Sequence, residues 1–217
     1  MAFLVGAVST FSVGAISTFS GNYHTSTTLD TTQTTQPARQ NTQVSTQPSA
    51  KPTQKPQPIF ANFGDGIFQV GKDIQPGTYR TRVGSSGCYY ARLKGFSGTL
   101  DDILANNNTD APAIVTIAKT DKGFESTNCG TWTQDLSQIT TSKTSFDDGM
   151  YLVGTDIAPG TYKNSGSSSC YYARLSGFTN TIDSIISNNN TDAAAIVTIA
   201  ASDKGFESTR CGTWTKL

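Results

Sequence analysis

The sequence predicts an all-β protein with two small antiparallel β-sandwich or barrel modules in tandem, each with one disulfide, preceded by an apolar N-terminal segment and a disordered linker. The first observation is a repeat, because FGDGIFQVGKDIQPGTY at Phe63 returns as FDDGMYLVGTDIAPGTY at Phe146. The second is a series of short aromatic and β-branched runs separated by Gly, Asn, Asp and Pro, which is typical of antiparallel strands. The third is the equal spacing of two cysteines in each copy. Duplication of one cross-linked unit explains all three.

Composition sets the expected domain boundaries. We expect a signal-like or membrane-anchoring segment over residues 1–20, a disordered tether over 21–61, a first β-module over 62–134, a connector over 135–145 and a second β-module over 146–217. Each module is so small that a single hydrophobic core is marginal without a cross-link.

The N-terminal segment predicts export or anchoring. Residues 2–19 are apolar, rich in small side chains and free of charge. Such a run is long enough for the core of a signal peptide or for a marginal membrane span. The basic residues that usually precede a signal-peptide core are missing, and a buried helix is a third interpretation. Both cleavage and retention of the segment fit the pattern.

Residues 21–61 differ in composition from everything around them. They are rich in Thr, Gln, Pro and Ser, and His24, the single histidine of the chain, lies among them. This composition cannot bury enough apolar surface to offset the entropy lost on ordering. Spaced prolines favour extended conformations, so we expect a tether that holds the modules away from the N-terminal segment.

Short strands account for most of each module. In the first module we expect them at residues 67–70, 89–93, 114–118, 124–127 and 131–133, and the second copy repeats each one. Pro76 and Gly77 predict a type II turn, since Pro pre-sets φ and Gly permits positive φ at the next position. Residues 99–104 predict at most a turn or two of helix with Thr99 as its cap. The asparagine run at 106–108 then predicts a turn.

The four cysteines all lie in the modules: Cys88, Cys129, Cys170 and Cys211. Equal spacing makes bonds within each module, Cys88 to Cys129 and Cys170 to Cys211, the simplest pairing. Closing a loop of this size stabilises a fold by about 4 kcal/mol in the chain-entropy description. A zinc site is the rival interpretation, but zinc ligands come as paired cysteines or with nearby histidines. Free buried thiols are the other alternative. Disulfides would imply an oxidising compartment.

Charge argues against nucleic acid as a partner. The chain has 16 basic and 16 acidic residues, for a formal net charge of zero. The basic residues form no block like those that bind phosphate backbones. We therefore expect no nucleic-acid partner, and contact with a membrane only through the N-terminal segment.

The modules contain few of the residue types that catalyse reactions. Without a histidine, and with the cysteines assigned to cross-links, serine–histidine and cysteine–histidine mechanisms are excluded. A carboxylate pair for glycoside cleavage could come from Asp65, Asp73, Asp101 and Glu125, or from their counterparts Asp148, Asp156, Asp183 and Glu207. Each of these also fits a turn, a cap or a surface pair, and no run resembles a calcium-binding loop. We expect no catalytic residue, no metal and no cofactor.

Candidate binding residues come from the aromatic and arginine positions of the repeat: Tyr89, Arg92 and Trp132, with Tyr171, Arg174 and Trp214 in the second copy. An aromatic and guanidinium surface of this kind could bind a sugar or a peptide. The arginines also fit structural ion pairs with Asp101 or Glu125, since the guanidinium fork matches a carboxylate. Trp132 also fits packing against the disulfide.

Four motifs carry a resemblance to a known module. They are VGxDIxPGTYR at 70–80, CYYARLxGF at 88–96, DDILANNN at 101–108 and FESxxCGTW at 124–132. Together they resemble an extracytoplasmic β-module of secreted, lipid-anchored or membrane-tethered proteins of actinobacteria and Chloroflexota. The resemblance implies an all-β fold, a location outside the cytoplasm and an accessory role. It implies no activity.

These observations favour a non-catalytic exported or cell-surface module pair that binds an envelope polymer (glycan) or a protein partner. A structural stalk, layer or filament subunit that self-assembles is the alternative from a different class. A small secreted hydrolase is a third. Repetition of a surface in two copies suits a repetitive ligand, because linked sites bind such a ligand more tightly than either alone.

Overall fold

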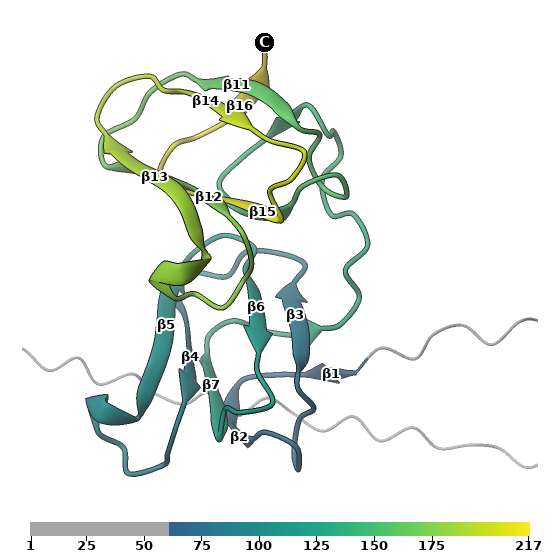
Figure 1. Cartoon of the computed structure of the whole chain (residues 1–217), viewed down its shortest axis with the longest axis vertical. Coiled ribbons are helices and arrows are strands. Elements are labelled where there is room, and N and C mark those ends of the chain that lie inside the picture. Colours follow the sequence, from purple (N-terminus) through teal and green to yellow (C-terminus); the bar gives the residue numbers. More distant parts are fainter. Residues whose placement is uncertain (1–60) are drawn as a thin grey trace, which may run out of the picture. The chain divides into compact units, whose positions relative to one another are not determined.

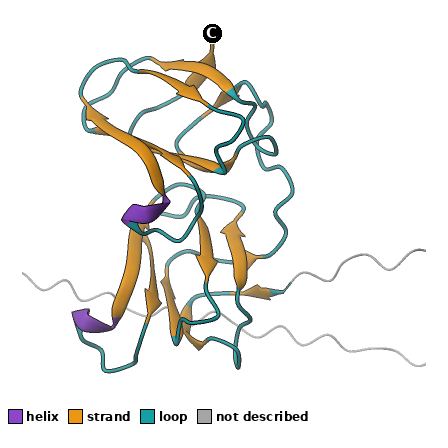
Figure 2. Cartoon of the chain, viewed as in Figure 1, coloured by secondary structure: helices purple, strands orange, loops and turns teal. Residues whose placement is uncertain are grey.

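The computed structural model describes residues 61–217, which contain both repeats and fall in a single compact unit (Figure 1). The predictions for residues 1–20 and for most of the tether lie outside the described residues. Strands, turns and two single-turn 3-10 helices make up the described chain, which confirms the predicted all-β class (Figure 2). Among residues 61–217, no helix is long and apolar enough to cross a membrane.

The first repeat is a sandwich of two antiparallel sheets. Its strands are β1 (Asn62–Phe63), β2 (Gly66–Gln69), β3 (Gly77–Thr81), β4 (Cys88–Leu93), β5 (Ile103–Thr109), β6 (Ile114–Ile117), β7 (Gly123–Thr127) and β8 (Trp132–Thr133). They form two four-stranded sheets in the orders β1-β8-β3-β6 and β2-β7-β4-β5. Every neighbouring pair within these sheets is antiparallel.

The second repeat has the same topology. Its strands are β9 (Ser145–Phe146), β10 (Gly149–Leu152), β11 (Gly160–Asn164), β12 (Cys170–Leu175), β13 (Ile185–Thr191), β14 (Ile196–Ile199), β15 (Gly205–Thr209) and β16 (Trp214–Lys216). The sheets run in the orders β14-β11-β16-β9 and β10-β15-β12-β13. The 3-10 helices η1 (Leu100–Asp102) and η2 (Ile182–Ser184) occupy equivalent positions in the two repeats.

The predicted strands are present, and three local predictions were wrong. Pro76 and Gly77 form no type II turn, because Gly77 begins β3 with a φ of 158°, whereas that turn needs a φ of about +80°. The asparagine run at 106–108 lies inside β5 and pairs with β4, because ladder hydrogen bonds to a central strand outweigh the low β propensity of Asn. Thr99 makes no side-chain cap on η1. Instead, the carboxylate of Asp102 accepts hydrogen bonds from the amides of Ser97 and Gly98 and so closes the loop before the helix.

Each repeat has its own core between its two sheets. In the first repeat, the rings of Tyr90, Phe124 and Trp132 contact one another, and Phe124 meets Trp132 edge to face. The second repeat places its own Tyr, Phe and Trp in the same arrangement. The disulfides are Cys88–Cys129 and Cys170–Cys211, and each belongs to the core cluster of its repeat. The predicted pairing within modules is confirmed.

The connector is fixed to both repeats. The side chain of Ile139 packs against the core of the second repeat. Arg82 in the first repeat donates to the carboxylate of Asp135 at 3.0 Å and to the carbonyl of Gln138 at 3.2 Å. The connector therefore helps to hold one face of the first repeat against one face of the second.

Candidate functional site between the repeats

The outer face of the sheet β10-β15-β12-β13 is apolar because side chains alternate along its strands. Tyr151 and Tyr172 point into the core of the second repeat. Their neighbours Met150 and Ala173 point outward and join a separate buried cluster, whose full membership is Ile114, Met150, Ala173, Leu175 and Phe178. Ile114 belongs to the first repeat, so this third cluster is the apolar centre of a contact between the repeats.

Backbone hydrogen bonds border this cluster. The amide of Met150 donates to the carbonyl of Pro112 at 2.8 Å, and the amide of Thr116 donates to the carbonyl of Phe178 at 2.7 Å. Thr116 belongs to β6 and Pro112 lies just before this strand, which is the edge of its sheet. An exposed edge presents unpaired amides and carbonyls. The second repeat therefore satisfies polar groups of the β6 edge while covering its apolar side chains.

A buried ion pair joins the repeats. Arg80 donates to the two carboxylate oxygens of Asp156 at 3.2 and 3.0 Å, and neither side chain is exposed to solvent. Asp156 also accepts from the amides of Ile139 and Leu152, at 2.9 and 2.8 Å. Arg80 donates as well to the carbonyl of Ser137 at 3.2 Å. A buried carboxylate with this many donors is well compensated for its lost hydration.

Arg92 and Tyr90 on β4 contact the loop that precedes η2. The guanidinium of Arg92 holds the carboxylate of Asp121 at 2.7 and 2.8 Å and donates to the carbonyl of Thr179 at 2.8 Å. The hydroxyl of Tyr90 accepts from the side-chain amide of Asn180 at 2.9 Å. Burial raises the pKa of Tyr90, so its hydroxyl stays protonated and neutral within the contact.

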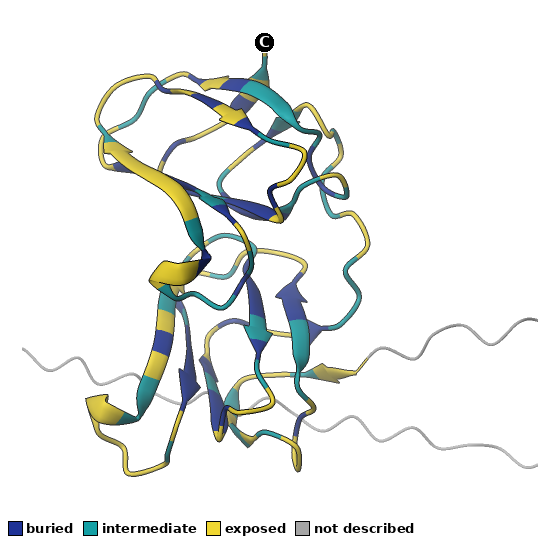
Figure 3. Cartoon of the chain, in the orientation of Figure 1, coloured by how far each residue is buried: buried dark blue, intermediate teal, exposed yellow. Residues whose placement is uncertain are grey.

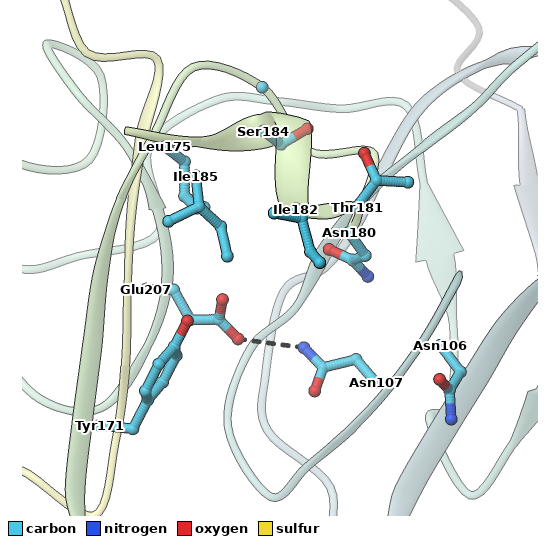
Figure 4. Close-up of a pocket in the computed structure, with 11 residues that line it drawn as sticks. Asn106, Asn107, Tyr171, Leu175, Asn180, Thr181, Ile182, Ser184, Ile185 and Glu207 are labelled. Atoms are coloured by element: carbon cyan, nitrogen blue, oxygen red, sulfur yellow. Dashed lines mark hydrogen bonds between the residues drawn. The ribbon is translucent and has the colours of Figure 1, made fainter. Parts of the chain in front are cut away.

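Beside this contact lies a polar groove of about 220 Å³ (Figure 4). Its walls come from both repeats: Asn106 and Asn107 from β5, Tyr171 from β12, Asn180 and Ile182 near η2, and Glu207 from β15. Figure 4 shows Asn107 facing Glu207 across the groove. The two side chains are joined by a hydrogen bond of 3.0 Å from Nδ2 to Oε1.

Burial governs the electrostatics of the groove. It raises the pKa of Glu207, and the hydrogen bond from Asn107 only partly opposes the increase. The pKa of Tyr171 is raised by burial first and then by the nearby charge of Glu207. The groove thus offers one carboxyl group, two amides from β5, a phenol and an apolar Ile182. Within residues 61–217, no cluster of three His, Cys, Asp or Glu side chains could hold a metal ion.

The predicted binding residues are not gathered on one surface. Trp132 and Trp214 are fully buried in the two cores, so a ligand at the surface cannot reach either indole. The indole N–H of Trp132 donates to the hydroxyl of Ser126 at 2.9 Å. Of the six candidate residues, the structure places Tyr171 in the groove. Tyr89 lies on the corresponding face of the first repeat.

The arginines serve as structural ion pairs, but with partners other than those predicted. Arg92 binds Asp121 and Arg174 binds Asp203, instead of Asp101 or Glu125 in the first copy. The hydrogen bond from Arg174 lowers the pKa of Asp203. In each repeat the aspartate lies in the turn before β7 or β15 and also accepts an amide hydrogen bond, from Ala118 or Ala200.

Sequence reasoning did not identify most of the groove. Asn106 and Asn107 are identical in type to Asn188 and Asn189, so nothing in the pattern separates the copy in the groove from the copy outside it. Glu207 was considered only as one of several possible carboxylates. Asn180 carried a usable signal, because the equivalent position in the first repeat is Gly98.

Comparison with known proteins gives the chain relatives but no solved structure. The family described as the Rv1352-like extracellular domain matches twice, over residues 61–133 and 143–215. The uncharacterized proteins Rv1352 of Mycobacterium tuberculosis and Mb1387 of Mycobacterium bovis are each 33% identical, over 32% of this chain and 67% of the relative. No solved structure matches the chain. The tandem match and the two disulfides place the repeats outside the cytoplasm.

Proposed function

The chain belongs to the Rv1352-like extracellular domain family, and on that premise we propose that it is a non-catalytic extracellular protein that binds an envelope glycan in the groove between its repeats. The observation that carries the proposal is the convergence of Asn106, Asn107, Tyr171 and Glu207 from two repeats on one groove. Amide, phenol and carboxyl groups provide the donors and acceptors that sugar hydroxyls require.

The size of the groove supports a polymer as the ligand. Pockets that enclose a whole drug-sized molecule measure ~300–1,000 Å³, whereas this groove measures about 220 Å³. A groove of this size suits a single sugar unit of a longer chain. A polymer offers the groove of each chain many equivalent binding positions, which raises the apparent affinity in proportion to their number.

The roles of the carboxylates support binding without catalysis. Asp65 accepts hydrogen bonds from the hydroxyl of Ser126 and the amide of Cys129, at 2.7 and 2.9 Å, and Asp148 accepts the equivalent bonds in the second repeat. Burial alone would raise the pKa of Asp65, but these hydrogen bonds outweigh it and lower the pKa. Such a carboxylate is engaged in holding the loop beside the disulfide.

We further propose that residues 21–61 hold the repeats away from the cell surface and that residues 1–20 direct the chain out of the cytoplasm. Fractionation of cells that produce the full chain tests this. Recovery in the membrane fraction identifies an anchor, and a shortened chain in the medium identifies a cleaved signal. Recovery of the full-length chain from the cytoplasm contradicts the proposal.

The binding test uses the full extracellular chain, purified cell wall and an array of envelope glycans, at a concentration at which the chain is monomeric. Asn106→Ala and Tyr171→Phe each remove one polar group from the groove. Each substitution should weaken binding about fivefold, because a neutral hydrogen bond contributes about 1 kcal/mol. Asn188→Ala and Tyr89→Phe make the same changes at the equivalent positions outside the groove and should leave binding unchanged.

Two results would overturn the proposal. The first is equal weakening by the groove variants and by their counterparts. The second is turnover of a glycan or peptide that Glu207→Gln abolishes while the melting curve stays intact, since this would identify an enzyme.

A further inference from the structure

The two repeats carry the same outer sheet face, but only one copy is covered. In the second repeat Met150 is 3% exposed and Phe178 is 6% exposed. Their counterparts in the first repeat, Ile67 and Phe96, are 64% and 51% exposed. The outer face of β2-β7-β4-β5 thus leaves the apolar side chains of Ile67 and Phe96 open to solvent, whereas Ala91 and Leu93, the counterparts of Ala173 and Leu175, are buried within the first repeat itself. We call this outer face the free sheet face.

The surface that does the covering also occurs twice. In the first repeat it consists of β6 and β5, with Ile114 fully buried. In the second repeat it consists of β14 and β13, where Ile196 is 60% exposed. Figure 3 shows β13 almost entirely exposed, whereas β5 alternates between exposed and covered residues. We call the β13–β14 surface the free edge face.

The polar groups of the contact are retained on the two free faces. Asp73 on the first repeat is the counterpart of Asp156, and Lys163 on the second keeps the positive charge of Arg80; both are exposed. Glu125 keeps the carboxyl of Glu207, and the exposed Asn189 keeps the amide of Asn107. The free faces are therefore complementary in charge as well as in apolar surface.

We propose that the free sheet face of one chain binds the free edge face of a second copy of this chain, in the arrangement that joins the two repeats within a chain. Such a contact is heterologous, since different surfaces of the two copies meet. Repetition of a heterologous contact produces a ring if the rotation closes and an open filament if it does not. An open filament, however many chains it contains, therefore has a free sheet face at one end and a free edge face at the other.

The same contact would complete a second groove. The free sheet face holds a cavity of about 330 Å³, whose lining includes Leu93, Leu100, Ile103 and Glu125. Its counterparts Leu175, Ile182, Ile185 and Glu207 line the groove between the repeats. The cavity lacks the wall that Asn106 and Asn107 supply there. Asn188 and Asn189 of a second copy would occupy that position, so each added chain would contribute one more groove.

The contact between chains should be weaker than the contact within a chain. Gly98 stands where Asn180 donates to Tyr90, and Lys163 cannot reproduce the two parallel bonds of Arg80. The connector that binds Asp156 through Ile139 has no equivalent between chains. Linkage also raises the effective concentration of the two repeats for each other. Assembly should therefore depend on chain concentration.

Sedimentation velocity and negative-stain electron microscopy of the full extracellular chain, without glycan, measure this assembly across a concentration series. We expect a shift from monomers to longer species as concentration rises. Phe96→Asp should block the free sheet face, and Ile196→Asp should block the free edge face. Both side chains are exposed, so each variant should melt like the unchanged chain and remain monomeric at every concentration.

Mixing the two variants gives the sharpest result. The Phe96→Asp chain keeps a free edge face and the Ile196→Asp chain keeps a free sheet face, so a mixture should form 1:1 dimers and nothing longer. Val83→Asp, which changes an exposed apolar residue outside both faces, is the control and should assemble like the unchanged chain. A chain that stays monomeric at all concentrations, assembly that survives either blocking variant, or a mixture that forms no dimer would overturn the proposal. Because no glycan is present, the outcome is independent of the binding proposed for the groove.

Discussion

At the scale of single residues, the pair Arg80–Asp156 offers the clearest test of the contact between repeats. Asp156→Ala leaves the guanidinium of Arg80 buried without its carboxylate. Breaking one partner of a buried pair costs about 3–5 kcal/mol of unfolding free energy. Urea denaturation of the full extracellular chain measures this loss.

The first repeat supplies the matched control. Asp73 is exposed and accepts an amide hydrogen bond from Gln69 at 2.8 Å, as Asp156 does from Leu152. Asp73→Ala should therefore cost only about 1 kcal/mol, the value of that bond. Equal losses in the two variants would show that the ion pair contributes nothing beyond its local turn.

Glu207 should make stability depend on pH. Burial raises the pKa of this carboxyl above its ordinary value of 4.5, so the folded chain binds the proton more tightly than the unfolded chain does. The stability that Glu207 contributes is fully present below about pH 4.5. It is lost as pH rises through the raised pKa of the folded chain. The hydrogen bonds that lower the pKa of Asp65 and Asp203 act in a more acidic range, because their ordinary value is 3.8.

Chemical denaturation between pH 4.5 and pH 7 checks the expected slope. Glu207→Gln should flatten the decline, because an amide cannot release the proton. Glu125→Gln makes the same change in the first repeat and should leave the decline in place. A decline that persists unchanged in Glu207→Gln would assign it to another group.

At the scale of elements, β7 and β15 each carry a glycine that packs against a phenylalanine ring. A Cβ at Gly205 in β15 would meet the ring of Phe178, and a Cβ at Gly123 in β7 would meet the ring of Phe96. Phe178 is buried in the contact between the repeats, whereas Phe96 is half exposed and can swing outward. Gly205→Ala should therefore cost about 1–3 kcal/mol through overpacking.

Gly123→Ala is the matched control for this change and should cost less than about 1 kcal/mol. Thermal melting of the two single variants compares them directly. Similar melting temperatures would show that Phe178 can move as freely as Phe96, and that the contact does not fix it.

At the scale of the whole molecule, each repeat should fold alone but lose stability. A chain of residues 143–217 keeps every buried residue of its core and its own disulfide, although it loses Ile139, which packs against that core. It also exposes Met150 and Phe178, which the first repeat covers in the full chain. We expect dispersed amide resonances, a cooperative melt, and a lower melting temperature than the same repeat has in the full chain.

A complementary measurement adds the first repeat in trans. Residues 61–142 should slow amide hydrogen exchange at Met150 if the contact forms between separate chains. A second repeat that stays disordered until the first is added would show that the two repeats share one core.

Much of the fold followed from the sequence because its signals are local. The strand pattern around CYYARL reappears as β4 and β12, and the equal cysteine spacing corresponds to the two disulfides. The asparagine run at 106–108 was expected to form a turn because Asn has low strand propensity. Its pairing with β4 depends on a neighbour that the local pattern does not contain.

Spacing and composition that both copies repeat are enough to predict the duplication, the all-β class and, as the simplest pairing, a disulfide within each module. Which copy of each surface is covered follows from the tertiary fold alone. Met150 and Ile67, or Ile114 and Ile196, occupy equivalent positions on equivalent strands, yet one of each pair is buried and the other exposed. The physical reason is that burial here comes from a neighbouring repeat, held in place by the connector and the Arg80–Asp156 pair, and neither copy encodes that neighbour in its own local pattern.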